Sequence, residues 1–243
     1  VDGSDPVIEG IARGLTELPA PDRLVVREED SPVFEVRTYY NPERRSAVQI
    51  VPGLIGVILN LTMVLFTAIA IVRERERGNL ELLITTPVAT PELMLAKIAP
   101  YVLIGLIQVT IILAAGVWLF DVPVRGSLID LYLASLLFIA AALSLGLLIS
   151  TLAQTQFQAM QLTVFTFLPS ILLSGFMFPF AGMPRVAQWI AEILPLTHFV
   201  RLVRGILLRG AGLPELMTPV YALAGFFAVT VTLAILRFRK RLD

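Results

Sequence analysis

Residues that could do chemistry are few in this chain and stand at the edges of long apolar tracts. There is no cysteine and one histidine, His198, so thiol catalysis is excluded and a histidine-rich metal site is not expected. The two lysines, Lys97 and Lys240, do not follow glycine or precede serine or threonine, as the lysine of a phosphate-binding loop does. We therefore predict no ATP site of that kind, no metal and no other cofactor in this chain.

The densest charged run lies between two apolar tracts and holds Arg73, Glu74, Arg75, Glu76, Arg77, Gly78 and Glu81. On a helix its acidic and basic residues form i,i+3 pairs of opposite charge. The leucines that follow would form an apolar side, and Pro87 would end the helix. The spacing predicts a short amphipathic helix over 73–86 along the membrane surface. Its charged side is either simply solvated or a docking site for a cytoplasmic partner.

A second group of candidates is polar or aromatic and lies toward the C-terminus: Gln161, Thr166, Ser170, Ser174, Trp189, Arg201 and Arg204. Uncharged polar residues inside apolar tracts mostly form interhelical hydrogen bonds, although some could line a substrate path. Residues 183–209 are typical of an amphipathic extracytoplasmic hairpin, with Trp189 on an apolar face and Glu192 opposite. This hairpin either anchors at the interface or gates the exit of an amphiphilic substrate.

Composition and charge distribution indicate a membrane protein and locate its spans. The 243 residues carry no net charge, and 56% are hydrophobic while only 16% are charged, against about 25% charged in soluble domains. This balance is typical of a membrane protein and excludes a disordered chain or a broad basic nucleic-acid-binding face. A span needs roughly 20 apolar residues. The charge-free tracts predict spans at about 50–72, 98–120, 128–152, 160–180 and 216–236.

The first part of the chain differs from the rest because it is polar and contains a strand-like run, Val33 to Tyr40. Some 47 residues cannot bury a core alone, so we interpret 1–47 as the C-terminal part of a larger α/β extracytoplasmic domain. Residues 48–243 form the transmembrane domain. Short loops hold eight basic residues on one side and five on the other, which places 73–97 and the C-terminus in the cytoplasm.

Several motifs, taken in their order along the chain, resemble those of ABC transporter type-2 permeases. The charged run with its following Thr86-Pro87 is similar to the segment after that family's second span, and Lys97 to Tyr101 is similar to the start of the next one. The first residues resemble the extracytoplasmic domain of the multidrug-export-like branch. The matching segments are 1–6, 74–83, 86–87, 97–101, 178–184, 194–197 and 204–208.

The resemblance implies an all-α polytopic fold with six spans in a full family member, of which this chain lacks the first. It implies the permease subunit of an ATP-driven exporter in the bacterial inner membrane, moving an amphiphilic substrate such as a drug or a lipid. A separate ATPase would bind ATP and magnesium and dock on residues 73–86, so the permease itself is not expected to be an enzyme. The expected partners are this ATPase, a second permease copy or paralogue, and membrane lipid, but no nucleic acid.

Two other classes remain open as alternatives to a driven permease. A secondary transporter normally places an acidic residue or histidine inside the bilayer, whereas no predicted span has one near its middle and Asp130 lies at an end. A non-transporting membrane scaffold is consistent with the composition. The amphipathic segment between two spans favours the driven permease, and co-purification of an ATPase would distinguish it from a scaffold.

Overall fold

The structure is a computed structural model that describes residues 46–78 and 90–239, and in these two ranges every regular element is helical. The predicted α/β domain at 1–47 lies outside the described residues, apart from its last two. The helices run in the order α2 (Ser46–Glu76), α4 (Thr90–Phe120), α5 (Leu128–Leu152), α6 (Gln156–Leu173), η1 (Phe180–Gly182), α7 (Arg185–Ile193), α8 (Pro195–Arg204), η2 (Gly205–Arg209), η3 (Leu213–Leu216) and α9 (Met217–Arg239).

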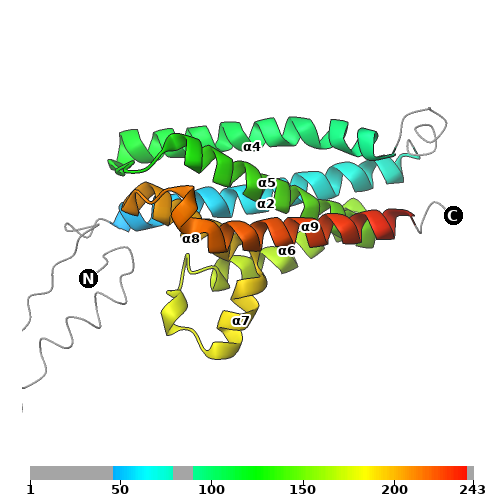
Figure 1. Ribbon diagram of the computed structural model, residues 1–243. Helices are drawn as coiled ribbons and strands as arrows, with labels where there is room; N and C mark the ends of the chain where they lie inside the picture. The colour runs from blue at the N-terminus through cyan, green and yellow to red at the C-terminus, as the bar shows by residue number, and fades with distance from the viewer. Residues whose placement is uncertain (1–45, 79–89, 240–243) are drawn as a thin grey trace, which may run out of the picture.

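Five of the described helices, α2, α4, α5, α6 and α9, are long and apolar enough to cross a membrane. They run up and down beside one another, so that the end of α2, the start of α4 and the end of α9 lie at one end of the bundle, with α8 at the other (Figure 1). This confirms the predicted all-α polytopic fold with five spans. The predicted bounds of α5, 128–152, coincide with the observed helix.

One predicted span, 160–180, is displaced in the structure, where α6 covers Gln156–Leu173. The helix begins earlier because the Thr155 hydroxyl accepts a hydrogen bond from the Gln158 backbone N–H at 3.2 Å and caps the first turn. It ends earlier because Gly175 takes a left-handed backbone conformation, with φ of 79°. Residues 156–159, which lie between the predicted spans 128–152 and 160–180, are therefore part of α6.

A second correction concerns the charged run. Residues Arg73 to Glu76 do not start a separate surface helix but continue α2, because no proline or glycine lies between Gly56 and Gly78 to interrupt it. At 1.5 Å per residue, the 31 residues of α2 span about 46 Å, whereas a hydrocarbon core measures about 30 Å. The charged turns therefore project beyond the hydrocarbon. Glu81 and the remainder of the predicted 73–86 helix, from 79 onward, lie outside the described residues, and the description resumes in α4 at Thr90.

The core is centred on α5, which packs against α2, α8 and α9. Gly146 lets α5 approach α2 so closely that an added Cβ atom would lie 2.7 Å from the Val64 carbonyl oxygen. The rings of Phe138 and Phe199 stack with their centroids 4.1 Å apart, which joins α5 to α8. Close backbone approach and aromatic stacking therefore hold the central helix in place.

Interhelical hydrogen bonds add to this packing. Thr62 on α2 donates to Gln108 on α4 at 2.9 Å, and the Ser144 and Thr230 hydroxyls join α5 to α9 at 2.6 Å. The predicted role of polar residues inside spans is confirmed for these pairs. On α6 the described hydroxyl bonds of Thr166 and Ser170 go to carbonyls of their own helix.

The region 183–209 folds as two short helices, α7 and α8, joined at Leu194. Helix α7 carries Trp189 with 70% of its surface exposed, as an interfacial helix would. Helix α8 differs from the predicted surface hairpin, since most of its residues, including Phe199, are buried against α2, α5 and α9. Its strongly apolar face serves the protein core, and only its arginine face remains accessible.

Candidate functional site

The first candidate site is the projecting end of α2, where the charged run meets the turn between α5 and α6. Arg75 donates from Nη1 to the Ala153 carbonyl and from Nη2 to the Ser150 carbonyl, both at 2.9 Å. The last carbonyls of a helix have no partner within it, and the negative end of the helix dipole favours a cation there. Arg75 therefore caps the C-terminus of α5.

Glu76 makes the complementary contact at the start of α6. Its Oε1 accepts the backbone N–H of Gln156 at 2.9 Å, and its Oε2 accepts the Gln156 side-chain amide. Arg73 Nε donates to Gln156 Oε1 at 3.3 Å. A carboxylate at a helix N-terminus is favoured by unpaired N–H groups and by the dipole. We call this set the α5–α6 clamp: Arg73, Arg75 and Glu76 on α2, with Ser150, Ala153 and Gln156.

The predicted coupling residues thus divide into two groups. Arg73, Arg75 and Glu76 all contact the α5–α6 turn. Arg73 and Arg77 are exposed and lie four residues apart, on one side of the end of α2. Glu74 is half-buried, and Gly78 ends the helix with φ of 68°. The structure leaves Arg73 and Arg77 accessible to a partner and gives Arg75 and Glu76 an internal role that spacing alone did not reveal.

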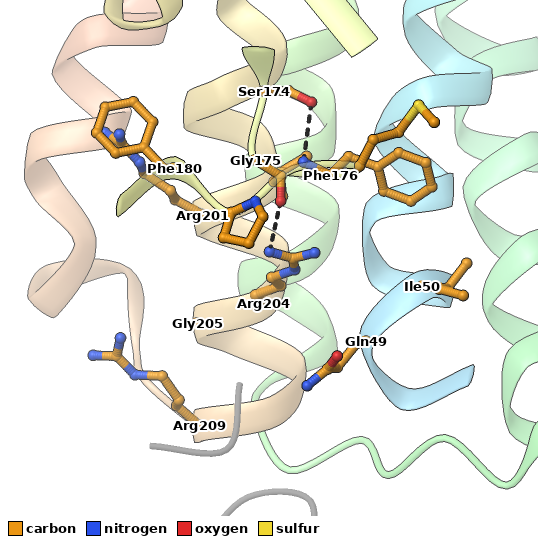
Figure 2. Close-up of a pocket in the computed structure, with 13 residues that line it drawn as sticks. Gln49, Ile50, Ser174, Gly175, Phe176, Phe180, Arg201, Arg204, Gly205 and Arg209 are labelled. Carbon is orange, nitrogen blue, oxygen red and sulfur yellow. Dashed lines mark hydrogen bonds between the residues drawn. The ribbon is translucent and has the colours of Figure 1, made fainter. Parts of the chain in front are cut away.

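The second candidate site is a pocket of about 440 Å³ at the opposite end of the bundle, which we call the arginine pocket. Its walls come from the first turns of α2, the segment after α6, and the α8–η2 helix (Figure 2). Its polar lining includes the arginines Arg201, Arg204 and Arg209, and its apolar lining includes Phe176 and Phe180. Further lining residues are Gln49, Ile50, Ser174, Gly175, Met177 and Val200.

Arg204 lies at the centre of the arginine pocket, between the segment after α6 and the Gln49 side of α2 (Figure 2). Its Nη1 donates to the Gly175 carbonyl at 3.0 Å. Gly175 turns that carbonyl toward Arg204 with a positive φ that side-chain-bearing residues rarely adopt. A guanidinium is therefore held in place at the point where the chain leaves α6.

Arg201 lies at the rim and ties α8 to α7. Its two terminal nitrogens donate to the Glu192 carboxylate at 2.6 and 3.1 Å, and its guanidinium lies 4.4 Å from the centre of the Phe180 ring. His198 Nε2 lies 2.8 Å from the Glu192 carbonyl oxygen. Because Arg201 donates to the carboxylate, the pKa of Glu192 is held below its usual value, with smaller electrostatic help from Arg201 and His198 against the opposing effect of partial burial.

Arg209 reaches the pocket because η2 is a π-helix. A π-turn holds about one residue more than an α-turn, so Arg209 lies roughly 100° around the axis from its place on a continued α-helix. An α-helix would instead have put residue 208 in line with Arg201 and Arg204. The third arginine of the pocket was therefore missed by the sequence analysis, since no local pattern marks this turn.

The predicted gate and substrate-path residues lie in different places in the structure, and only some of them line the arginine pocket. Ser174, Arg201 and Arg204 meet in the arginine pocket. Thr166 and Ser170 bond to their own helix and do not line it. Gln161 is exposed on the outer face of α6, in a shallow groove of about 240 Å³, and Trp189 is exposed on α7.

The Glu192–Arg201 pair predicts a specific pH dependence. A lowered carboxyl pKa means that the pair stabilises α7 fully above the ordinary glutamate pKa of about 4.3 and loses this effect as the pH falls further. With Trp118 replaced by Phe, the fluorescence anisotropy of Trp189 should stay constant from pH 8 to 5 and fall below about pH 4. E192Q should give a lower, flat profile, and a wild-type anisotropy that falls near neutral pH would contradict the assignment.

Comparison with known proteins gives a consistent family match. The family model described as ABC-2 type transporter matches residues 32–208. The chain is 34% identical over 250 residues to "Probable multidrug ABC transporter permease YbhS" of Escherichia coli, covering 100% of this chain and 66% of that protein. It is 35% identical over 216 residues to "Inner membrane transport permease YhhJ" of Escherichia coli, covering 85% of this chain and 56% of that protein.

A more distant relative shows how widely the similarity extends. "ABC transporter G family member 20" of Dictyostelium discoideum is 28% identical over 175 residues, which are 72% of this chain and 24% of that protein. The chain thus spans just under two thirds of the length of the first bacterial relative and a little over half of the second. All three relatives are named as permeases or transporters.

Proposed function

The chain belongs to the ABC-2 type transporter family, and on that premise we propose that it is the membrane permease of an ATP-driven exporter. In this proposal a separate ATPase binds and hydrolyses ATP with magnesium, and the permease moves an amphiphilic substrate outward. The protein is multi-pass, with five described helices that suit membrane spans. The bacterial relatives support placement in the bacterial inner membrane, with the charged end of α2 and the end of α9 in the cytoplasm.

One observation carries the ATPase-docking part of the proposal: α2 projects a charged end beyond the hydrocarbon while being tied to two further spans. The exposed Arg73 and Arg77 offer a positive surface to a partner, and the α5–α6 clamp connects that end to α5 and α6. A force applied at these arginines would therefore act on three spans together. No ATP site needs to lie in the permease for this coupling.

The outer face of α6 supports the proposal that a second copy or a paralogue completes the transporter. Gln161 is exposed there beside Met160, Val164, Phe165 and Leu168. A glutamine amide has four hydrogen-bonding positions, and facing hydrocarbon leaves them without partners. A facing protein helix would satisfy the amide and cover the apolar residues around it. We therefore place the contact between permease copies on α6.

The amphiphilic nature of the substrate is supported by the arginine pocket, whose walls combine guanidinium groups with Ile50, Phe176 and Met177. Such a mixed lining suits a molecule with a polar and an apolar part better than a small inorganic ion. The name of one relative includes the word multidrug, which fits the same class.

Charge reversal at Arg77 tests the docking proposal. R77E should reduce ATPase co-purification and transport-dependent ATP hydrolysis about tenfold, because like charges would meet at the interface. The free energy of unfolding should change by less than about 0.5 kcal/mol, since Arg77 is exposed at the helix end. The measurements are the amount of ATPase retained on the purified permease and its rate in proteoliposomes.

R185E provides the matched control, because Arg185 is equally exposed but lies on α7 at the opposite end of the bundle. It should retain the ATPase at the wild-type level. Equal retention by R77E and R185E would place the docking surface elsewhere, and a wild-type protein that retains no ATPase would refute the driven-permease proposal.

A further inference from the structure

We propose that the arginine pocket is a binding site for the phosphate group of an anionic phospholipid. The inference goes beyond the export function by naming an acidic lipid headgroup as the ligand. It rests on the proposed function only for the membrane setting. Binding itself does not require transport.

Charge is the first argument. Three arginines, Arg201, Arg204 and Arg209, line one pocket, and among its described lining residues none is acidic. Glu192, which pairs with Arg201, lies on α7 and is not part of the lining. Guanidinium groups present planar, forked donors that match phosphate oxygens, and they remain charged at all physiological pH values. The pocket is therefore built for an anion.

The second argument is the depth of the pocket in the bundle. Gln49 and Ile50 belong to the first turns of the α2 span, which begins at Val48, and Ser174 directly follows the last residue of α6. Two spans thus begin or end at this level. The boundary between hydrocarbon and water is where phospholipid phosphates lie. An anion site at this depth meets lipid headgroups before it meets a soluble metabolite.

The third argument is the apolar side of the same pocket. Ile50 is 49% exposed and Met177 is 56% exposed, so part of the apolar wall is left uncovered by the described part of the chain. Phe176 and Val200 continue this wall toward the arginines. A free phosphate would leave these groups in water, whereas the upper part of an acyl chain would cover them. A pocket with both arginines and an exposed apolar wall therefore favours a ligand that has an acidic group and an apolar chain.

The volume and the local backbone fit this assignment. A pocket of about 440 Å³ lies within the usual range of about 300–1,000 Å³ for small-molecule sites. The π-turn at η2 places Arg209 on the pocket side, and π-turns are frequently found at functional sites. Two unusual backbone features border the pocket: this turn, which carries Arg209, and Gly175, whose carbonyl accepts a hydrogen bond from Arg204.

The test measures lipid binding to the purified protein by native mass spectrometry. Phosphatidylglycerol and phosphatidylcholine with identical acyl chains are titrated separately, and the ratio of their apparent Kd values gives the headgroup preference. Wild type should prefer phosphatidylglycerol. R204Q should reduce the preference about tenfold, R204K should retain most of it, and R209Q should reduce it about threefold because Arg209 is more exposed.

R185Q is the control, since it removes an exposed arginine outside the pocket and should leave the preference unchanged. If R204Q fails to fold, R209Q tests the proposal instead, because the Arg209 side chain is exposed. Equal binding of the two lipids, or an R209Q preference equal to wild type, would overturn the proposal. Inorganic phosphate at 10 mM should not displace phosphatidylglycerol, and displacement would show that the site takes free phosphate instead.

This design separates the failure of this inference from the failure of the export proposal. A protein that retains no ATPase but keeps an arginine-dependent preference for phosphatidylglycerol leaves the lipid site standing. An active exporter without that preference overturns the lipid site alone.

Discussion

Replacing Gly146 by leucine should reduce the free energy of unfolding by about 3 kcal/mol, the largest effect we expect from a single substitution. Even an added Cβ would lie 2.7 Å from the Val64 carbonyl oxygen and 2.8 Å from Thr67 Cβ. Because one of these atoms is backbone, no rotamer change can relieve the clash, and α2 and α5 must separate. Unfolding of the purified protein in sodium dodecyl sulfate, followed by circular dichroism, measures the loss.

Gly225→Leu is the matched control on α9, where an added Cβ meets no atom within 4 Å. It should change the same free energy by less than about 0.5 kcal/mol. If the two leucine variants unfold alike, the close approach of α2 to α5 is not what stabilises the bundle. Their difference therefore measures the packing at Gly146 separately from the general effect of adding a leucine.

Replacing Arg75 by methionine should cost about 2 kcal/mol and release the turn between α5 and α6. The substitution keeps the apolar stem but removes both hydrogen bonds to the Ser150 and Ala153 carbonyls, which are then left to water. Backbone amides around Gln156 should exchange faster, since α2 no longer holds the turn beside Glu76. Hydrogen–deuterium exchange of peptides covering 150–160 measures the release.

Arg77→Met is the control for this variant, because Arg77 is two residues away and exposed. Its exchange pattern at 150–160 should equal that of the wild type. The two variants also contrast in function: Arg75 variants should lose stability first, whereas Arg77 variants should lose the ATPase from a stable protein. Faster exchange in both variants would mean that the clamp depends on total charge at the end of α2 and not on Arg75.

The spans were predictable from the sequence because long tracts without charge leave few other structures possible. Segment 128–152 was predicted with its observed bounds, since it carries no charge after Asp130 in its first turn and is mostly apolar. The bounds of α6 were not, because they depend on the Thr155 cap and the left-handed Gly175 and not on hydrophobicity. Helix α8 was placed at the surface because an amphipathic pattern does not tell whether lipid or protein covers the apolar side.

The sequence indicated many of the residues of the candidate sites, but it indicated only in part where the fold places them. The charged run was recognised, but which of its residues face inward depends on a turn that lies about 80 residues later in the chain. The arginine pocket combines three segments and a π-turn, so Arg201 and Arg204 could be singled out while Arg209 and Ile50 could not. Local patterns identify single helices, and tertiary contacts decide which helices share a site.

The clamp at Gln156 and the pocket at Ser174 lie at opposite ends of a single rod, α6. Its 18 residues measure about 27 Å, so a tilt of about 5° around the clamped end would carry Ser174 through a stroke of about 2 Å. That displacement would change the spacing between the Gly175 carbonyl and Arg204, which donates to it. Motion imposed at the charged end of α2 would thus reach the far side of the membrane by leverage, with no helix needing to unwind along the way.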